Sequence, residues 1–499
     1  MEIFEDKLSY KTFSEALEFQ ATIGNLFLEY NMVSIENKPS IPKYVYSKKY
    51  YFSYSDNCLW EEIPSQNMIS IIENWIRCQA RIIIQELGSS KTEQDQALEL
   101  FKTIKSVCKR SYLKDVVELI TPTMTDDKIF EKLDKVQPLL LPIKGCLVVD
   151  LQTGITRPRS ITDYFTWECD VKPVKKYSEF FLKAINNIMC NDMQRVDYLK
   201  KVLGYCLTGS IEAQSYFIWY GKGSNGKSLI LNLLAALLGK ACKPVAKGVI
   251  VNCGRKGEAG TEILSLKDLR VGTFSETCKM EALNEGTLKT LSGGDKITAR
   301  GLYKDPVEFK VFLKLIICTN HRPEFDGSDA GTVRRIKFLP FEAKFTRDTP
   351  RPEKNEFPII ENLENILIEK HLDEFFSWCL EGCALWFQDK GFKNIPKEIL
   401  EHQNNYIKEQ NSFVSWYNES IVKEDKKGLE RSFAYKHYEA YCSDQGIKPS
   451  TKKEFLDKLG EELGKPTKSS GTFVYKGFTI KTETEESDSD NDNHGNLDD

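Results

Sequence analysis

The sequence predicts an α/β fold built around a phosphate-binding loop, and three consecutive segments in the middle of the chain carry that prediction. Residues 215–220 are aromatic and β-branched, as in a buried strand. Residues 221–228 fit the pattern G-x-x-x-x-G-K-[ST]. Residues 229–238 are an apolar, helix-favouring run that ends at Gly239. A strand, a glycine-rich loop and a helix therefore follow one another in the order that such a loop requires.

Each part of the loop has a physical role in holding a polyphosphate. The glycines let backbone N–H groups wrap the phosphates, and the helix N-terminus adds positive partial charge. We expect Lys227 to reach the β- and γ-phosphates of ATP and the Ser228 hydroxyl to ligate Mg²⁺. The expected nucleotide-binding residues are Gly221, Lys222, Gly223, Ser224, Asn225, Gly226, Lys227 and Ser228.

The composition is that of a globular protein with several domains, about three or four for 499 residues. No stretch approaches the roughly 18 apolar residues of a membrane span, and the acidic start is unlike a signal peptide. The fourteen cysteines contain no C-x-x-C pair and have only five histidines as possible partners, which argues against a zinc site. We expect an intracellular protein in a reducing compartment, without a membrane partner.

The net charge of −4 conceals an uneven distribution. Residues 483–499 hold eight of the 73 Asp and Glu and no Lys or Arg, so the 69 basic residues exceed the other 65 acids and give residues 1–482 a net charge of +4. Residues 215–340 contain 20 Lys and Arg against 12 Asp and Glu. This basic segment is expected to meet a nucleic-acid backbone, although a merely solvated surface can have the same composition.

The N-terminal region, residues 1–135, is predicted to be mainly helical. Residues 65–87 and 92–110 have helical spacing, while residues 44–46 and 50–52 favour short strands. The function of this region is not evident from its residues.

Residues 136–210 are expected to form a connector and a helical collar. Residues 147–150 and 155–158 predict a hairpin with its turn at residues 152–154. Helical periodicity then runs from residue 178 to residue 207 and stops just before the strand of the phosphate-binding loop.

The α/β core is predicted for residues 211–345, followed by a helical segment at 346–425 whose large apolar residues suit a core. Residues 426–482 have the outline of a winged helix, a module that reads duplex DNA or contacts proteins. Its wing is predicted from two strands joined at Lys476-Gly477. Residues 483–499 form an acidic tail that is disordered by composition.

Two further core strands end in polar residues. Glu276 follows the first of them, which places a carboxylate at the strand end where ligands bind in an open α/β sheet. It could orient or deprotonate an attacking water and help to hold Mg²⁺, or it could be a solvated acid. Asn320 follows a long apolar strand at residues 310–319 and could hold that water or sense the γ-phosphate.

Arg334 and Arg335 follow Asn320 along the chain. An arginine that points into the nucleotide of a neighbouring subunit can stabilise phosphoryl-transfer charge, because a guanidinium stays charged and binds bidentately. A surface salt bridge is the alternative for either arginine. The sequence does not distinguish the two.

Three segments, in order along the chain, resemble the superfamily 3 helicases, and the closest kin look like the poxvirus-type and phage or plasmid primase-helicases. They are residues 273–277, 288–300 and 318–323. Residues 149–154 also resemble the domain before the helicase in that family, and residues 439–441 together with residues 453–455 resemble its C-terminal domain.

The resemblance implies an AAA+ P-loop ATPase core and a ring, usually hexameric, that translocates on single-stranded DNA and unwinds forked DNA in viral or plasmid-type replication. By position it implies that Glu276, Asn320 and one of the two arginines are catalytic. It also implies a DNA-gripping hairpin with Lys296, Arg300 and Lys304 as contacts. A lysine at such a tip can neutralise a phosphate without reading sequence, although an exposed turn lysine has the same residue type.

Two departures from the family pattern bear on function. Ser275 stands before Glu276 where many motors place a second acid, so one carboxylate must serve both metal and water. The D-x-D pattern, which suits a two-metal primase site, occurs only in the acidic tail, so we expect a separate primase on another chain. The alternatives to a helicase are a P-loop phosphotransferase and an ATP-dependent initiator or loader that does not unwind DNA.

Overall fold

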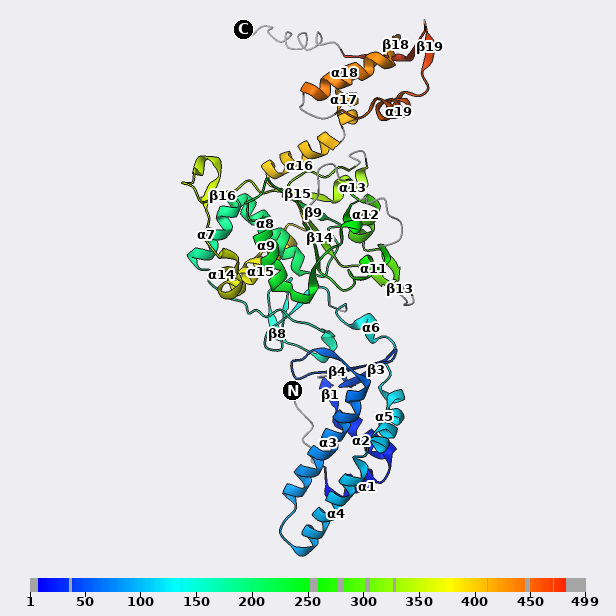
Figure 1. Ribbon diagram of the computed structural model, residues 1–499, viewed down its shortest axis with the longest axis vertical. Helices are drawn as coiled ribbons and strands as arrows, with labels where there is room; N and C mark the ends of the chain where they lie inside the picture. Colours follow the sequence, from blue (N-terminus) through cyan, green and yellow to red (C-terminus); the bar gives the residue numbers. More distant parts are fainter. Residues whose placement is uncertain are drawn as a thin grey trace, which may run out of the picture.

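The computed structural model describes residues 8–35, 38–135, 137–251, 259–275, 282–300, 306–325, 329–410, 412–444, 449–469 and 471–481. The molecule is elongated, with an N-terminal unit at one end, an α/β unit in the middle and a small C-terminal unit at the other end (Figure 1). Among the described residues, no helix has both the length and the apolar character to cross a membrane.

The N-terminal unit packs helices around its own core and carries two small antiparallel sheets. Buried apolar residues such as Phe13, Ile72 and Val116 belong to this core. The predicted helices at 65–87 and 92–110 and the strands at 44–46 and 50–52 are confirmed. The helices are α1 (Tyr10–Leu17), α2 (Gln20–Tyr30), α3 (Ser65–Glu86), α4 (Lys91–Val107), α5 (Arg110–Met124) and α6 (Ile129–Lys132); the strands are β1 (Met32–Ile35), β2 (Lys38–Pro42), β3 (Tyr44–Ser47), β4 (Tyr50–Tyr54) and β5 (Trp60–Ile63).

A three-stranded antiparallel sheet and two helices connect this unit to the α/β unit. The predicted hairpin is confirmed by the pairing of β7 (Leu147–Asp150) with β8 (Thr156–Pro158), and β6 (Leu140–Ile143) completes the sheet. The single helical stretch predicted for residues 178–207 is wrong, because it is divided into α7 (Glu179–Ile188) and α8 (Met193–Leu207). Cys190 and Asn191 have positive φ at the break, and the Asp192 carboxylate caps the new helix.

The central unit contains a five-stranded parallel sheet with the strand order β10-β11-β14-β9-β15. The strands are β9 (Tyr216–Tyr220), β10 (Cys242–Pro244), β11 (Val271–Ser275), β14 (Lys314–Thr319) and β15 (Ile336–Pro340). Helices cover both faces: α9 (Lys227–Leu238), α10 (Lys247–Ile250), α11 (Ala259–Leu264), α12 (Glu285–Gly293) and α13 (Ala330–Arg335). The carboxyl ends of β9, β11 and β14 therefore meet at one edge, which is where ligands bind in such sheets.

The long strand predicted for residues 310–319 is wrong in its extent. Residues 314–319 form β14 inside the sheet, whereas β13 (Pro306–Lys310) pairs with β12 (Lys296–Arg300) in a separate antiparallel hairpin. Val311 and Leu313 are buried between the two strands. An apolar run therefore continues across the corner where the chain leaves the hairpin and enters the sheet.

The segment after the sheet is mostly helical and packs back onto the collar. Gly204 of α8 and Gly382 of α15 allow the two helices to touch, because a Cβ at either position would collide with the backbone of the other helix. Phe375, Phe376 and Trp378 are buried there, as expected for core residues. The elements are β16 (Lys344–Thr346), β17 (Glu356–Pro358), α14 (Leu363–Lys370), α15 (Leu372–Gln388) and α16 (Lys397–Gln410).

The C-terminal unit combines three helices with a three-stranded antiparallel sheet of order β18-β20-β19. The predicted strand break at Lys476-Gly477 is wrong, because β20 runs unbroken through both residues and pairs with β19 before them. The elements are α17 (Ser412–Ser420), β18 (Ile421–Glu430), α18 (Arg431–Asp444), α19 (Lys452–Leu463), β19 (Thr467–Ser469) and β20 (Thr472–Ile480).

Candidate functional site

The loop between β9 and α9 has a backbone that only its glycines allow. Gly223 and Gly226 have φ values of 99° and 86°, in the left-handed region. A Cβ at Gly226 would lie 2.8 Å from Cγ1 of Ile188, and one at Gly221 would collide with the Asn225 side chain. The glycine positions of the loop pattern are therefore required by its shape.

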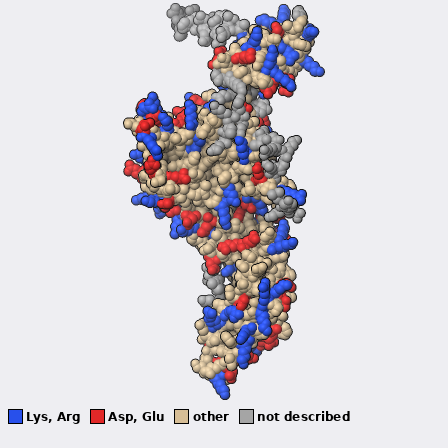
Figure 2. All heavy atoms as spheres, viewed as in Figure 1, with Lys and Arg blue, Asp and Glu red and all other residues tan. Residues whose placement is uncertain are grey.

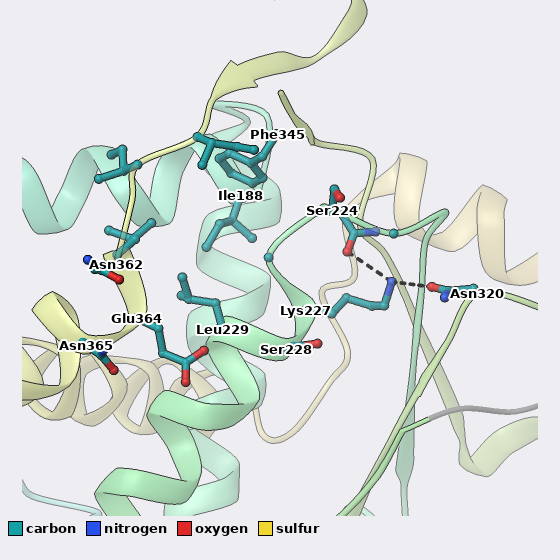
Figure 3. A pocket seen from close by; sticks show the side chains of 16 residues that line it. Ile188, Ser224, Lys227, Ser228, Leu229, Asn320, Phe345, Asn362, Glu364 and Asn365 are labelled. Carbon is teal, nitrogen blue, oxygen red and sulfur yellow. Dashed lines mark hydrogen bonds between the residues drawn. The ribbon is translucent and has the colours of Figure 1, made fainter. Parts of the chain in front are cut away.

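Lys227 begins α9 and points into the edge of the sheet rather than into solvent (Figure 3). Its Nζ donates hydrogen bonds to the Gly221 carbonyl oxygen at 2.8 Å, to Asn225 Oδ1 at 3.1 Å and to Asn320 Oδ1 at 3.2 Å. The side chain is 6% exposed, and burial lowers the pKa of its ammonium. None of these three contacts is with a carboxylate, so the positive charge of Lys227 is available to an anion.

A cavity of about 650 Å³ opens beside the loop. Its walls come from five separate parts of the chain, and Figure 3 shows Ile188 and Phe345 on one side and Asn362, Glu364 and Asn365 on another. The lining residues are Ile188, Gly223 to Leu229, Asn320, Phe345, Ile359, Ile360 and Asn362 to Asn365. The cavity is thus bounded by the polar loop, by the apolar side chains of Ile188 and Phe345 that lie against the loop, and by a wall that carries both apolar and polar side chains.

The loop is anchored to the strand on each side of β9. The Gly221 N–H donates to the carbonyl oxygen of Thr319 at the end of β14, and the Phe345 N–H donates to the carbonyl oxygen of Ser224. The Asn225 amide donates to the Phe341 carbonyl oxygen at 3.1 Å. These bonds keep the loop between the ends of β14 and β15, with Ser228 exposed at the start of α9.

Two predicted site residues lie outside the described residues. Glu276, the carboxylate expected after β11, is one, and Lys304 at the tip of the hairpin is another. The stem of the hairpin is described: Lys296 is exposed and forms an ion pair with Glu308 at 2.9 Å, and Arg300 is exposed at the end of β12. Within the described ranges, no cluster of His, Cys, Asp and Glu is arranged to hold a metal ion.

The two neighbouring arginines have different surroundings. Arg334 is exposed and donates to Gln214 Oε1 at 3.2 Å. Arg335 turns inward, donates to the Gly331 carbonyl oxygen at 2.7 Å, and has its pKa lowered by burial and by the charge of Arg334. Arg334 is therefore the more exposed of the two arginines.

The sequence did not reveal the cavity walls that lie outside the loop and Asn320. Ile188, Phe345, Ile359 and Asn362 have no pattern that marks a binding site, and they meet only because the collar and the segment after β15 pack beside α9. The positive φ of Asn362, just before α14, gives no usable signal because asparagine in that conformation is common in turns.

Two family descriptions match parts of this chain. Residues 29–190 match the family described as "D5 N terminal like", and residues 219–335 match a "Family of unknown function (DUF5906)". The second match covers the phosphate-loop sequence, strands β10, β11 and β14 of the sheet, and the arginine pair.

Curated relatives come from large DNA viruses. The chain is 26% identical over 454 residues to putative helicase L207/L206 of Acanthamoeba polyphaga mimivirus, which covers 86% of this chain and 46% of that protein. It is 27% identical over 309 residues to putative helicase 022R of Frog virus 3, covering 59% of this chain and 31% of that protein. It is 24% identical over 320 residues to putative primase C962R of African swine fever virus, covering 59% and 32%.

The chain thus spans about a third to a half of the length of these curated relatives. A solved structure of the NrS-1 C-terminal region aligns with 92% of this chain and 99% of that one, at 11% identity and a TM-score of 0.46. A likeness at that level adds nothing to the relationship with the viral proteins.

Proposed function

We propose that this chain, which belongs to the phage and viral primase-helicase family, hydrolyses ATP to unwind DNA during replication. The observation that carries the proposal is the position of Lys227, whose buried ammonium lies between the glycine loop and Asn320 at one end of the cavity. We further place the chain in superfamily 3, with an AAA+ type of ATPase core.

The polyphosphate of ATP would lie on residues 221–228. The constrained glycines leave the backbone open to an anion, and the N-terminus of α9 adds positive partial charge. An arriving phosphate replaces the neutral oxygens around Lys227 with charged ones. The pKa of Lys227 would then rise again, because a charged partner favours the ammonium form.

The base and ribose of the nucleotide would occupy the part of the cavity that is lined by residues outside the loop. Ile188, Phe345 and Ile359 offer surfaces against which a planar base can pack, and Asn362 and Asn365 offer amides for its edge. A volume of about 650 Å³ is within the range of small-molecule sites.

Mg²⁺ would be held by the Ser228 hydroxyl at the start of α9 and by Glu276, with water and phosphate oxygens as its other ligands. Bound there, the ion neutralises charge that develops on the transferred phosphoryl group. The Ser228 side chain is exposed beside Lys227, which fits this role. Glu276 would orient or deprotonate the attacking water, and Asn320 would position that water from the next strand.

Arg334 would act in trans on the nucleotide of a neighbouring subunit. Its exposed guanidinium can reach a partner surface, whereas Arg335 is committed to the Gly331 carbonyl within its own subunit. The active sites would then form between subunits of a ring, and a homo-hexamer is the form that we propose.

DNA would contact the hairpin β12–β13 in the channel of that ring. Lys296 and Arg300 are exposed on β12, and Lys304 follows at the tip. These residues would neutralise backbone phosphates of a single strand without reading its sequence. A separate primase and forked DNA remain proposed partners.

The test is steady-state ATP hydrolysis with and without single-stranded DNA, together with strand separation on a forked substrate. Lys227→Ala should abolish turnover, and Lys304→Ala should lose only the stimulation by DNA. Lys240→Ala is the matched control, because Lys240 is exposed at the other end of α9.

The outcomes separate the alternatives. Turnover that is indifferent to DNA would favour a phosphotransferase. DNA-stimulated turnover without strand separation would favour an initiator or loader. Full activity in Lys227→Ala would exclude residues 221–228 as the nucleotide site.

A further inference from the structure

Charge is unequally distributed in the C-terminal unit between helix α19 and the ribbon that strands β19 and β20 form. The order of elements is helix, strand, helix, helix, strand, strand, from α17 through β18, α18, α19 and β19 to β20. In helix-turn-helix proteins the second helix of the pair, here α19, is the one that enters the major groove of DNA.

Helix α19 is poorly suited to that role. It carries three lysines and four acids, and among its exposed residues are Asp457, Glu461 and Glu462. Figure 2 shows many blue side chains on this unit, at the top of the view, with a few red ones among them. Acidic side chains that face a groove walled by phosphates are repelled by them.

The N-terminus of α19 is also occupied already. The Glu454 carboxylate accepts hydrogen bonds from the Thr451 N–H at 3.1 Å and from the Thr451 hydroxyl at 2.8 Å, and these bonds lower its pKa. The first turn of a recognition helix is the part that contacts base edges. In α19 the Glu454 carboxylate occupies this first turn, where it would repel a DNA phosphate.

The ribbon has the opposite charge. Residues 464–481 contain four lysines and no Asp or Glu. Lys465, Lys468 and Lys476 are exposed, and none of the three forms an ion pair with a described carboxylate. Their charges are therefore uncompensated at short range.

The ribbon also exposes an aromatic ring. Phe473 lies opposite Lys468 in the pairing of β19 with β20 and is 47% exposed. The Arg431 guanidinium stacks over this ring at 5.5 Å, and no described carboxylate forms an ion pair with it. Arg431, Lys468 and Phe473 thus form a basic surface around one aromatic ring.

We propose that this unit is a winged helix that binds duplex DNA through its wing, β19–β20, and not through helix α19. Lys468 and Phe473 lie on one face of the ribbon, and Lys476 lies on the other, because side chains alternate along a strand. β19 and β20 pair with each other only over Thr467–Ser469 and Thr472–Val474, and Lys476 lies opposite Gly428 of β18. The two-stranded tip would enter the major groove with Lys468, and Lys476 would meet a phosphate at the edge of that groove. Single-stranded DNA would contact only one face of the wing.

The experiment measures DNA binding by the full chain without nucleotide, so that it does not depend on ATP turnover. Fluorescence anisotropy compares a duplex of about 20 base pairs with the single strand of the same length, between about 50 and 200 mM salt. The wing variant is Lys465→Ala/Lys468→Ala/Lys476→Ala. The control is Lys452→Ala/Lys453→Ala, which removes two exposed lysines from α19.

The wing variant should lose about tenfold or more in duplex affinity at 100 mM salt, and the slope of log affinity against log salt should become shallower by about 2 to 3. Phe473→Ala should weaken duplex binding without changing that slope. The control variant should bind as the unmodified chain does, and thermal unfolding of each variant verifies its fold.

Three results would overturn the proposal. Unchanged duplex affinity in the wing variant would mean that the wing does not bind duplex DNA, and it would favour an acidic protein as the partner of the wing. An equal loss for single-stranded and duplex DNA would contradict the groove geometry. If the control variant loses as much duplex affinity as the wing variant, α19 also contacts the DNA. None of these depends on whether the chain hydrolyses ATP.

Discussion

The Nζ of Lys227 lies 3.2 Å from the Oδ1 of Asn320, so the first residue of α9 and the first residue after β14 are joined by a hydrogen bond across the edge of the sheet. These two residues are 93 positions apart in the chain. The contact places the Asn320 amide beside the group that we expect to hold the γ-phosphate. It also predicts how loss of the amide should affect catalysis.

Asn320→Ala should lower the turnover number for ATP by about 100-fold while nucleotide affinity changes little. The loop and Lys227 remain to bind phosphate, but the donor that would position water is lost. Turnover and nucleotide affinity are measured separately, by steady-state kinetics and by fluorescent-nucleotide titration. Asn418→Ala, at an exposed amide on α17, is the control. Equal losses in affinity and turnover would contradict the role proposed for Asn320.

Gly226→Ala should weaken nucleotide binding and lower the unfolding temperature. The new Cβ would lie 2.8 Å from Ile188 Cγ1, and the φ of 86° costs a non-glycine residue about 1 to 3 kcal/mol. The double variant Gly226→Ala/Ile188→Ala relieves the contact but not the backbone strain, so it should recover only part of the thermal stability. Gly286→Ala, where no atom lies within 4 Å of the new Cβ, should not weaken nucleotide binding. Complete recovery in the double variant would show that φ at residue 226 is unimportant.

Arg334→Ala should lower ATP turnover by about 1,000-fold without loss of nucleotide binding, because the missing charge acts on the neighbouring subunit. Mixing Arg334→Ala subunits with Lys227→Ala subunits should restore part of the turnover, since each kind supplies what the other lacks. Arg335→Ala should instead lower thermal stability, because its guanidinium bonds to Gly331 within the subunit. Mixtures that stay inactive while both variants assemble would argue against Arg334 as the trans-acting residue.

Lys314 provides a pH-dependent test of the fold. It is 1% exposed, and burial, with a smaller effect from the nearby Arg270 charge, lowers its pKa to about 7. Its Nζ donates to the Thr208 carbonyl oxygen at the end of α8. Between about pH 7 and the ordinary lysine pKa near 10.5, the unfolded chain binds a proton that the folded chain does not, so this group favours folding increasingly as pH rises.

Lys314→Met removes that pH dependence. The stability of the unmodified chain relative to Lys314→Met should therefore increase by up to about 1.4 kcal/mol per pH unit above pH 7 and level off below it. Urea unfolding at several pH values measures the difference between the two proteins, which cancels the groups that they share. Lys240→Met, at an exposed lysine, should show no such trend. A difference that is constant from pH 6 to pH 9 would mean that Lys314 titrates alike in both states.

The sequence by itself determined the elements whose signals are local. The glycine loop was predictable because φ restrictions and the helix N-terminus are properties of adjacent residues, and the structure shows positive φ at Gly223 and Gly226. The same holds for the helices 65–86 and 91–107 and for the hairpin after residue 147. Hydrophobic spacing and turn residues act over a few positions, so they can be read along the chain.

Tertiary structure decided what depends on contacts between distant segments. The apolar run at 310–319 has one hydrophobic pattern, but only packing assigns β13 to a hairpin and β14 to the sheet. Arg334 and Arg335 are identical residue types in sequence, and only the tertiary structure shows that Arg334 is exposed while Arg335 is partly buried and bonded to Gly331. The cavity wall of Ile188, Phe345 and Asn362 likewise exists only once the collar and the segment after β15 enclose α9, because long-range packing leaves no local signature in the sequence.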